Sequence, residues 1–423
     1  MKAVIMAGGF GKRLAGFYGD RPKPMVEICG RPVLEYQIEN LRKSGIKDII
    51  IVVHHMKDYI MNYFGDGTNL GVNISYYEEE VPLGTAGALF RIREKLSENF
   101  LLINGDLIFS VDFRKMIDFH LENNALVTLF VHPNSHPYDS ELVVCDKNNI
   151  VTDWFKNDGK GNYKNCVNAG IHILSKEILY SSHKEGKLNL RADLVEPIIE
   201  SGRVYAYHSA EYVKDMGTAD RIQNVTADIE KNIVSEKRAD KKQKAVFLDR
   251  DGTINKYKGY ITSPKQLELI NGAAEAIKKI NQSGYLAIVI TNQPSIAMGR
   301  LSYTVLDEIH AKLDTLLGEE GAYTDALYFC PHHPDRGFKG EISELKIKCD
   351  CRKPSGGMIR KAAEDFNIDL SRSFMVGDSD KDVLAAIDAG CTPIFLTGSD
   401  NVIDIPNVRK YKNLYDFIKD EID

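Results

Sequence analysis

Just past its midpoint the chain reads Ala245-Val246-Phe247-Leu248-Asp249-Arg250-Asp251-Gly252-Thr253, an apolar run that ends in two carboxylates. A short apolar run predicts a buried strand, and open α/β sheets bind their ligands beyond the carboxyl ends of such strands. We therefore expect Asp249 and Asp251 to face one ligand site. A plain Asp-Gly turn is the alternative, and the rest of this half decides between the two.

Two other apolar runs in this half also end in polar groups, and a pair of cations lies between them. The residues are Thr291 and Asn292 after 286–290, Asp378 to Asp382 after 374–376, and the cations Arg352 and Lys353. An ionised carboxylate beside Mg²⁺ can attack phosphorus, while a second carboxyl protonates the leaving oxygen and later activates water. The pattern predicts a phosphatase with Asp249 as nucleophile and Asp251 as acid/base.

This order of motifs resembles the haloacid dehalogenase-like (HAD-like) superfamily over nearly the whole C-terminal half. The resemblance implies that Thr291, Asn292, Arg352 and Lys353 bind the phosphate or the rest of the substrate. It also implies a Mg²⁺ ion held by Asp249, Asp251 and Asp378.

A second metal site is predicted from cysteines and a histidine at ligand spacing. Cys330-Pro331-His332 precedes Cys349-Asp350-Cys351, and three sulfurs with one imidazole suit a closed, structural Zn²⁺ site. His333 competes with His332 for the fourth position. A zinc-bearing arrangement of this kind resembles the branch that contains D-glycero-D-manno-heptose 1,7-bisphosphate phosphatases and histidinol-phosphate phosphatases.

Apolar runs alternate with helical periodicity in both halves, which predicts two α/β domains. The runs are 3–6, 33–41, 49–53, 59–64 and 100–103 in the first half, and 245–248, 273–280, 286–290, 374–376 and 393–396 in the second. The first set predicts a parallel, doubly wound, Rossmann-like sheet, and the second predicts another α/β sheet. The HAD-like resemblance implies that this second sheet is Rossmannoid, and the cysteine and histidine motif adds a zinc-bound loop. We expect domains at 1–230 and 244–423, joined by a charged linker at 231–243.

The N-terminal half carries its polar and glycine-rich motifs at the ends of the predicted strands. They are Gly8, Gly9, Gly11 and Arg13 in the first loop, then Lys23, then Gly84-Thr85-Ala86, then Asp106, then Asn168 with Gly170, and finally Asp215. A glycine-rich loop lets phosphates approach the backbone, although alone it is often a plain strand-to-helix connection.

Taken in this order, these motifs resemble the sugar-1-phosphate nucleotidylyltransferases, and closely the guanylyltransferases among them. The resemblance implies the following roles: the first loop with Arg13 holds the triphosphate, Lys23 the reacting phosphates, Gly84 to Ala86 the nucleoside, Asn168 and Gly170 the sugar, and Asp106 with Asp215 a Mg²⁺ ion. Lys156 is a candidate sugar-phosphate ligand whose role the sequence leaves open.

Composition excludes several classes of function. A formal net charge of -6 argues against nucleic-acid binding, and we expect no membrane span and a cytoplasmic protein. The only tryptophan, Trp154, is expected to pack at the edge of the core rather than stack on a base.

The two resemblances together suggest consecutive steps on one sugar. We expect hydrolysis of the 7-phosphate of heptose 1,7-bisphosphate, then transfer of GMP from GTP to heptose 1-phosphate. One alternative pairs mannose 1-phosphate guanylylation with a histidinol-phosphate-type or other small phosphatase, and another makes the N-terminal half a nucleotide sensor without turnover. The sequence leaves open the base, the anomer, channelling and whether the chain forms a homo-oligomer.

Overall fold

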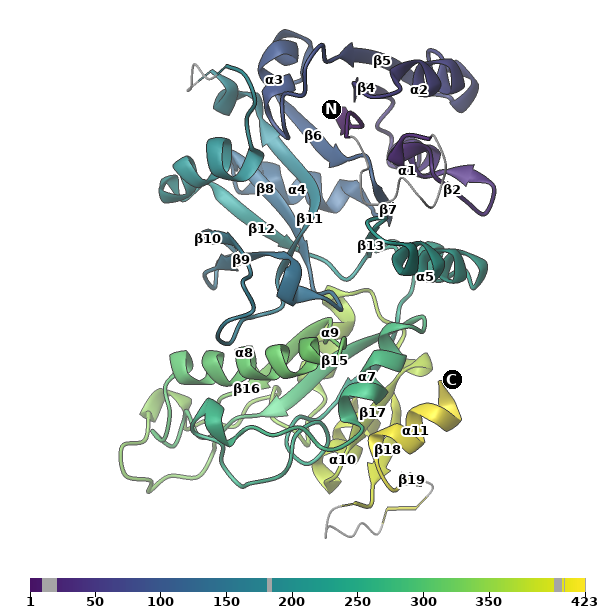
Figure 1. The fold of residues 1–423 in the computed structure, drawn as a ribbon. Helices are drawn as coiled ribbons and strands as arrows, with labels where there is room; N and C mark the ends of the chain where they lie inside the picture. The colour runs from purple at the N-terminus through teal and green to yellow at the C-terminus, as the bar shows by residue number, and fades with distance from the viewer. Residues whose placement is uncertain (10–20, 181–184, 399–404, 407, 423) are drawn as a thin grey trace. The chain divides into compact units, whose positions relative to one another are not determined.

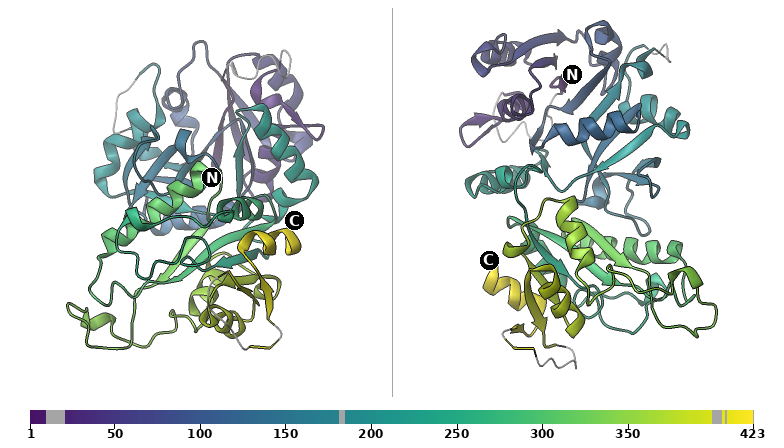
Figure 2. Two further views of the ribbon diagram at one scale, coloured as in Figure 1. Left: turned by 60° about the horizontal axis from the view of Figure 1, so that its bottom comes forward. Right: turned by 180° about the vertical axis from the view of Figure 1, so that it is seen from behind.

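The computed structural model describes residues 1–9, 21–180, 185–398, 405–406 and 408–422. The chain divides into two compact units, and each is a sheet flanked by helices (Figures 1 and 2). Unit 1 comprises Met1–His132, Glu141–Lys156 and Val167–Arg238, and unit 2 comprises Pro133–Ser140, Asn157–Cys166 and Ala239–Asp423. No described helix is long and apolar enough to cross a membrane.

Among its described residues, unit 1 is built on a nine-stranded sheet with the order β10-β9-β11-β6-β1-β4-β5, to which β8 and β12 add beside β11. Its strands are β1 (Lys2–Met6), β4 (Asp48–Val53), β5 (Asn73–Glu78), β6 (Asn99–Asn104), β8 (Val127–His132), β9 (Glu141–Cys145), β10 (Val151–Lys156), β11 (Val167–Ser175) and β12 (Val204–His208). Two ribbons stand apart, β2 (Glu27–Ile28) with β3 (Arg31–Pro32) and β7 (Leu107–Ser110) with β13 (Tyr212–Asp215). The helices are α1 (Val33–Lys43), α2 (Lys57–Phe64), α3 (Gly87–Ile92), α4 (Phe113–Glu122), α5 (Ala219–Glu230) and α6 (Ile233–Glu236).

The predicted parallel sheet is confirmed for β6, β1, β4 and β5, which are linked through helices. It is wrong for the other side of the sheet, where β11 runs antiparallel to β6 and β9 runs antiparallel to β10. The physical reason is the short connection between β9 and β10, because only antiparallel strands can be joined without a long crossover.

The strand order of unit 1 reverses beside β1. The chain passes from β1 to β4 and β5 on one side and then returns to β6 on the other side. Such a reversal leaves a crevice beyond the carboxyl ends of the two central strands, where ligands bind in open sheets. Gly8 follows β1 there, and Asp106 follows β6.

Unit 2 has a six-stranded parallel sheet with the order β16-β15-β14-β17-β18-β19. Its strands are β14 (Lys244–Leu248), β15 (Tyr285–Asn292), β16 (Ala326–Cys330), β17 (Phe374–Gly377), β18 (Thr392–Leu396) and β19 (Arg409–Tyr411). Its helices are α7 (Ala273–Asn281), α8 (Tyr303–Glu319), α9 (Gly357–Asp365), α10 (Asp380–Ala389) and α11 (Leu414–Glu421).

The helices of unit 2 form because apolar residues recur at helical spacing. In α7 the buried residues Ala273, Ala276, Ile277 and Ile280 make one stripe, which faces the core beneath the sheet. The strand order reverses at β14, with β15 on one side and β17 on the other. Asp249 and Asp378 follow these two central strands and therefore meet at the crevice.

The segment expected to be a linker at 231–243 contains α6, which is ordered against unit 1. Ile233 is buried in a cluster with β7 and α5 residues, and the backbone N–H of Tyr212 donates to the carbonyl of Lys237 at 3.2 Å. The sequence did not predict this short helix, because the residues after Val234 are mostly charged and show no apolar periodicity.

Candidate active sites and a metal-ligand cluster

Three carboxylates converge at the reversal point of unit 2. Asp249 follows β14, Asp378 follows β17, and Asp382 lies in the first turn of α10. One oxygen from each lies within 4.8 Å of the others, which is a ligand set for a divalent cation. Asp382 is fully buried and accepts hydrogen bonds from the N–H and hydroxyl of Ser379 at 3.1 and 2.6 Å.

Lys353 joins two of these carboxylates. Its Nζ lies 2.7 Å from Asp249, 2.6 Å from Asp382 and 2.7 Å from the carbonyl oxygen of Ile290, so its three donors are all used. Burial acts to lower the pKa of Lys353, but the charges of the two aspartates outweigh it and raise that pKa. The lysine is therefore a fixed positive charge.

Burial also alters the carboxylates themselves. It raises the pKa of Asp249 well above the usual range, with Asp382 adding to the rise and Lys353 opposing it. Burial, aided by the charge of Asp382, raises the pKa of Asp378 to about 6. The buried carboxylates Asp249 and Asp378 therefore bind protons more readily than exposed aspartates do, and a bound cation would compete with those protons.

Asp251, which was also predicted to hold the Mg²⁺ ion, is not a member of this three-carboxylate cluster. The fully buried Arg250 reaches it with Nη2 at 2.7 and 3.0 Å, Asn255 donates to it at 2.9 Å, and Gln293 donates at 3.0 Å. These contacts fix the direction of the carboxyl that was predicted to be the acid/base. Gly252 comes next with φ of +91°, and a Cβ at this position would collide with the carboxylate of Asp378.

The ends of β15 and the cation segment are bound together. Asn292 donates to the carbonyl of Lys353 at 3.0 Å and accepts from its N–H at 3.1 Å. The buried hydroxyl of Thr291 accepts from Gln293 at 3.0 Å. Arg352 donates to the carbonyl of His332 at 3.2 Å. All four predicted phosphate or substrate ligands of this half therefore belong to one connected group.

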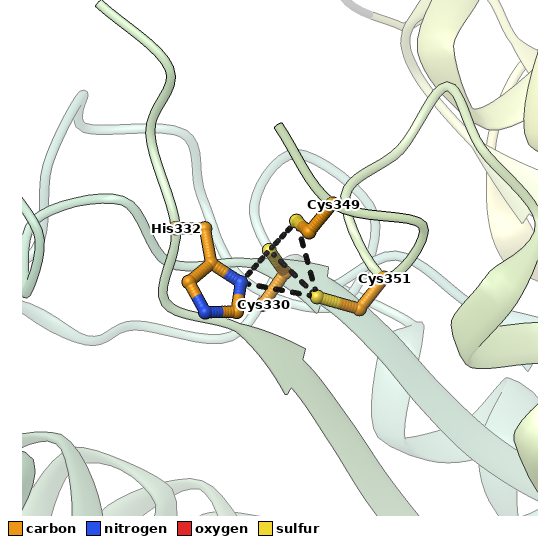
Figure 3. A group of neighbouring side chains, drawn as sticks. All are labelled: Cys330, His332, Cys349 and Cys351. Carbon is orange, nitrogen blue, oxygen red and sulfur yellow. Dashed lines mark hydrogen bonds between the residues drawn. The ribbon is translucent and has the colours of Figure 1, made fainter. Parts of the chain in front are cut away.

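The predicted cysteine and histidine ligands form one cluster (Figure 3). The sulfur of Cys351 lies 3.3 Å from those of Cys330 and Cys349 and 3.2 Å from Nδ1 of His332. A tetrahedral Zn²⁺ with Zn–S bonds of ~2.3 Å separates its sulfurs by roughly 3.8 Å, so the group is close to that geometry. Burial raises the pKa of Cys330, which means that thiolates here need a cation.

His332 is the histidine of the cluster, and its neighbour turns elsewhere. His333 accepts the N–H of Asp335 at 3.2 Å and packs edge-on against Phe338 at 5.3 Å between ring centroids. Of the two histidines that the sequence offered, His332 is therefore the one that lies within the cluster.

In unit 1 the described residues also place cation and carboxylate pairs at the crevice. Lys23 forms an ion pair with Asp106, and Arg221 bonds both oxygens of Asp215 at 2.7 and 2.9 Å. The N–H of Met216 donates to the carbonyl of Asp106 at 2.8 Å, so the segments that carry the two acids lie side by side. Gly11 and Arg13, predicted to hold a triphosphate, lie outside the described residues.

The small-residue loop of unit 1 is braced by another loop. Ala86 donates its N–H to the carbonyl of Leu188 at 3.1 Å, and the hydroxyl of Thr85 accepts the N–H of Leu190 at 2.7 Å. The Thr85 hydroxyl therefore ties the two loops together as an acceptor, and its own O–H can still donate. Gly84 has φ of +78° and approaches Leu188 too closely for a side chain.

Glu79 is a buried acid beside this loop that the sequence did not single out. Its Oε1 accepts the N–H of Leu83 at 3.2 Å, and its Oε2 would lie 2.9 Å from a Cβ placed on Gly8. Burial raises the pKa of Glu79. A glutamate directly after an alternating strand, five residues before Gly84, was the available signal.

Asn168 and Gly170 lie on an irregular part of β11, where the pairing with β8 shifts register between Asn168 and His172. Gly170 has φ of +76°, and a Cβ there would come within 2.5 Å of Nδ2 of Asn104. The bulge therefore presses β11 against the end of β6, two residues before Asp106. Lys156 ends β10 and is exposed.

Comparison with known proteins gives matches for both halves. The family model of nucleotidyl transferases matches residues 2–232, and the HAD-hydrolase-like model matches residues 350–412.

Relatives with curated names extend these matches. Over 169 residues the chain is 40% identical to D-glycero-beta-D-manno-heptose-1,7-bisphosphate 7-phosphatase of Haemophilus ducreyi, which covers 40% of this chain and 90% of that protein. Over 231 residues it is 32% identical to D-glycero-alpha-D-manno-heptose 1-phosphate guanylyltransferase of Aneurinibacillus thermoaerophilus, which covers 54% of this chain and 99% of that protein. The crystal structure of HddC from Yersinia pseudotuberculosis is 26% identical and covers 54% of this chain and 99% of its own, with a TM-score of 0.49.

Proposed function

Because the chain belongs to the nucleotidyl transferase family through its N-terminal half and to the HAD-like phosphatases through its C-terminal half, we propose that it performs two consecutive reactions on one heptose. Unit 2 hydrolyses the 7-phosphate of heptose 1,7-bisphosphate. Unit 1 then transfers GMP from GTP to heptose 1-phosphate, giving GDP-heptose and pyrophosphate. The observation that carries the proposal is that relatives of the two halves are named for a 7-phosphatase and a 1-phosphate guanylyltransferase, which act on phosphates of the same heptose.

In unit 2 the reaction uses Asp249 and Asp251 in turn. Asp249 attacks phosphorus, the bond between phosphorus and O7 breaks, and Asp251 gives a proton to O7. Asp251 then takes a proton from water, which attacks the aspartyl phosphate and releases inorganic phosphate. Mg²⁺ held by Asp249, Asp378 and Asp382 would neutralise phosphate charge during both steps.

The group around Lys353 serves the same reaction by fixing charge. The lysine holds Asp249 and Asp382 in place, and it offsets the repulsion among three neighbouring carboxylates. Arg352 precedes it in the same positive segment, and we assign its guanidinium group to the substrate phosphate. Zn²⁺ bound by Cys330, His332, Cys349 and Cys351 would order the loop that delivers this segment.

In unit 1 the protein supplies no covalent nucleophile. An oxygen of the sugar 1-phosphate attacks the α-phosphorus of GTP, and pyrophosphate leaves from the opposite side. We assign Lys23 and Arg13 to the phosphates, and Asn168 and Gly170 to the sugar. Mg²⁺ held by Asp106 and Asp215 would neutralise the triphosphate, after displacing the ion pairs that these acids make with Lys23 and Arg221.

The choice of guanine is supported by Glu79. Guanine presents N1–H and the 2-amino group side by side, and one carboxylate can accept both hydrogen bonds. Glu79 lies beside Gly8 and four residues before Leu83, where the small-residue loop begins. A buried acceptor at this place favours guanine over bases that lack paired donors.

The anomer follows from where each reaction occurs. The phosphatase relative is named for the beta bisphosphate and the guanylyltransferase relative for the alpha 1-phosphate. Unit 2 breaks a bond at O7, far from C1, whereas unit 1 acts directly on the 1-phosphate. Unit 1 therefore sets the requirement, and we assign the alpha anomer to the pathway and the cytoplasm as its compartment.

Purified protein with Mg²⁺, GTP and the alpha or beta bisphosphate tests the proposal. We expect phosphate release followed by pyrophosphate release and GDP-heptose, with the alpha anomer alone completing the second step. Asp249→Asn should stop phosphate release yet leave guanylylation of supplied heptose 1-phosphate, and Asp106→Asn should do the reverse. Turnover of histidinol phosphate or mannose 1-phosphate in preference to the heptoses would refute the substrate assignment.

A further inference from the structure

The register shift in β11 brings Asn168, Gly170 and His172 together. The amide oxygen of Asn168 lies 3.3 Å from the backbone nitrogen of Gly170 and 2.9 Å from Nε2 of His172. A regular strand would send these side chains along its faces without closing such a ring of contacts. The bulge therefore creates a small network at the position assigned to the sugar.

The Gly170 contact settles which way the Asn168 amide points. A backbone N–H can only donate, so the atom of Asn168 that faces it must be the oxygen. Nε2 of His172 faces the same oxygen and must donate as well. Rotating the amide by half a turn would set its NH₂ group against two donors and lose both hydrogen bonds.

His172 is suited to this task at physiological pH. Its side chain is buried, and this burial lowers its pKa to about 4 against a smaller opposing effect of the Leu102 backbone, so the ring is neutral and carries one proton. That proton belongs on Nε2, because Nε2 is the ring atom that faces the Asn168 oxygen. The neutral imidazole is thus a fixed donor to Asn168.

The other end of the Asn168 amide is available to a ligand. Its Nδ2 makes no hydrogen bond within the described residues, and the side chain is partly exposed. With the oxygen occupied twice, the amide can offer only N–H donors to whatever lies beyond it.

We propose that His172 is a positioning residue that holds the Asn168 amide as a donor to a hydroxyl oxygen of the acceptor sugar, an inference that rests on the proposed transferase function. His172 does not touch substrate; it acts through Asn168. The affinity of unit 1 for its sugar would then depend on a buried side chain that does not itself contact the sugar.

Steady-state kinetics of guanylyl transfer tests this with His172→Phe, His172→Gln and Asn168→Ala. Phenylalanine fills the ring space without donating, so the KM for heptose 1-phosphate should rise roughly five- to tenfold, the loss expected for one hydrogen bond. The KM for GTP should stay unchanged. Glutamine retains an N–H donor and should restore most of the sugar affinity.

The double variant His172→Phe with Asn168→Ala separates positioning from general damage. If His172 acts only through Asn168, its replacement should add nothing once the amide is gone. Trp154 provides the folding control, because it is the only tryptophan and its ring centroid lies 6.1 Å from that of His172. Unchanged emission from Trp154 shows that the surrounding core survives the substitution.

An unchanged sugar KM in His172→Phe would overturn the inference, as would an equal rise in the KM for GTP or an additive double variant. Failure of the proposed function gives a different result, since wild-type protein would then make no GDP-heptose at all. In that case the wild-type reaction with other sugar 1-phosphates and nucleotides identifies the acceptor, and the same three variants are compared on it.

Discussion

Replacing Lys353 by methionine removes the only described cation that contacts both Asp249 and Asp382. Lys353 has 3% of its side chain exposed, and its two ion pairs measure 2.7 and 2.6 Å. Breaking a buried ion pair by removing one partner costs about 3–5 kcal/mol, because the charge left behind is uncompensated. For a unit of this size that lowers the melting temperature by roughly 6–20 °C.

The loss should depend on pH. Burial already raises the pKa of Asp249, and without the lysine that carboxyl binds a proton still more readily. Protonation of this carboxyl relieves more of the repulsion at pH 6 than at pH 8. We therefore expect a larger destabilisation at pH 8 than at pH 6, reduced by added Mg²⁺, whose charge takes the place of the ammonium group.

Differential scanning calorimetry of the full chain measures this, with Lys361→Met as the matched control. Lys361 is an exposed lysine on α9 in the same unit, paired with Asp365 at 2.7 Å. The control should change little at either pH, and guanylyl transfer should survive in both variants. Phosphate release should fall roughly 10²–10³-fold in Lys353→Met alone. A melting shift no larger than that of the control, or one independent of pH, would refute the charge argument.

Three further predictions concern unit 2. Cys351→Ser should lower the zinc content measured by elemental analysis and reduce phosphate release roughly 10–100-fold. Cys29→Ser, which lies outside the cluster, should change neither quantity. Full zinc occupancy in Cys351→Ser would contradict the ligand assignment. The raised pKa of Asp378 stabilises the metal-free fold fully below pH 3.8, and this contribution is lost as the pH rises through about 6. The rise in melting temperature that Mg²⁺ produces should therefore grow from pH 5 to pH 7.5. A rise that is the same at every pH would count against the carboxylate cluster. Gly252→Ala should abolish phosphate release, because the added Cβ collides with Asp378. Gly259→Ala is the control: this glycine has φ of +71° and open space around it, so its replacement costs only the backbone strain, about 1 kcal/mol. Equal activity of the two variants would mean that the collision with Asp378 is relieved.

The apolar runs were sufficient to predict the central strands and helices of both sheets. They failed for the antiparallel side of unit 1, because β8, β9 and β10 are also short apolar runs and carry no sign of direction. They failed for α6 because so short a helix has too few apolar residues to show a period. The sequence did show that each polar group follows the end of a strand. That position decides which polar side chains come together at the edge of a sheet.

The residues to which the sequence assigned no role of their own share a physical character. Asp382, Arg250 and His172 are buried polar side chains whose partners lie on other elements or behind the site. A sequence shows residue type and spacing, whereas the hydrogen bonds that orient a carboxyl or an amide depend on tertiary packing. Asp382 had a usable signal, since it lies in the first turn of the helix that begins directly after Asp378 and Ser379.

The way the cation segment is attached limits how this sequence can change length. Cys351 is fixed by the ligand cluster, and Lys353 is fixed on both its N–H and its carbonyl by Asn292. An insertion or deletion between these anchors would move the ammonium group away from Asp249. Residues 334–348 are anchored by single contacts, such as the N–H of Ile342 on the carbonyl of Ala297 at 3.0 Å. We therefore expect a change of length in that loop to cost less than one between Cys351 and Lys353.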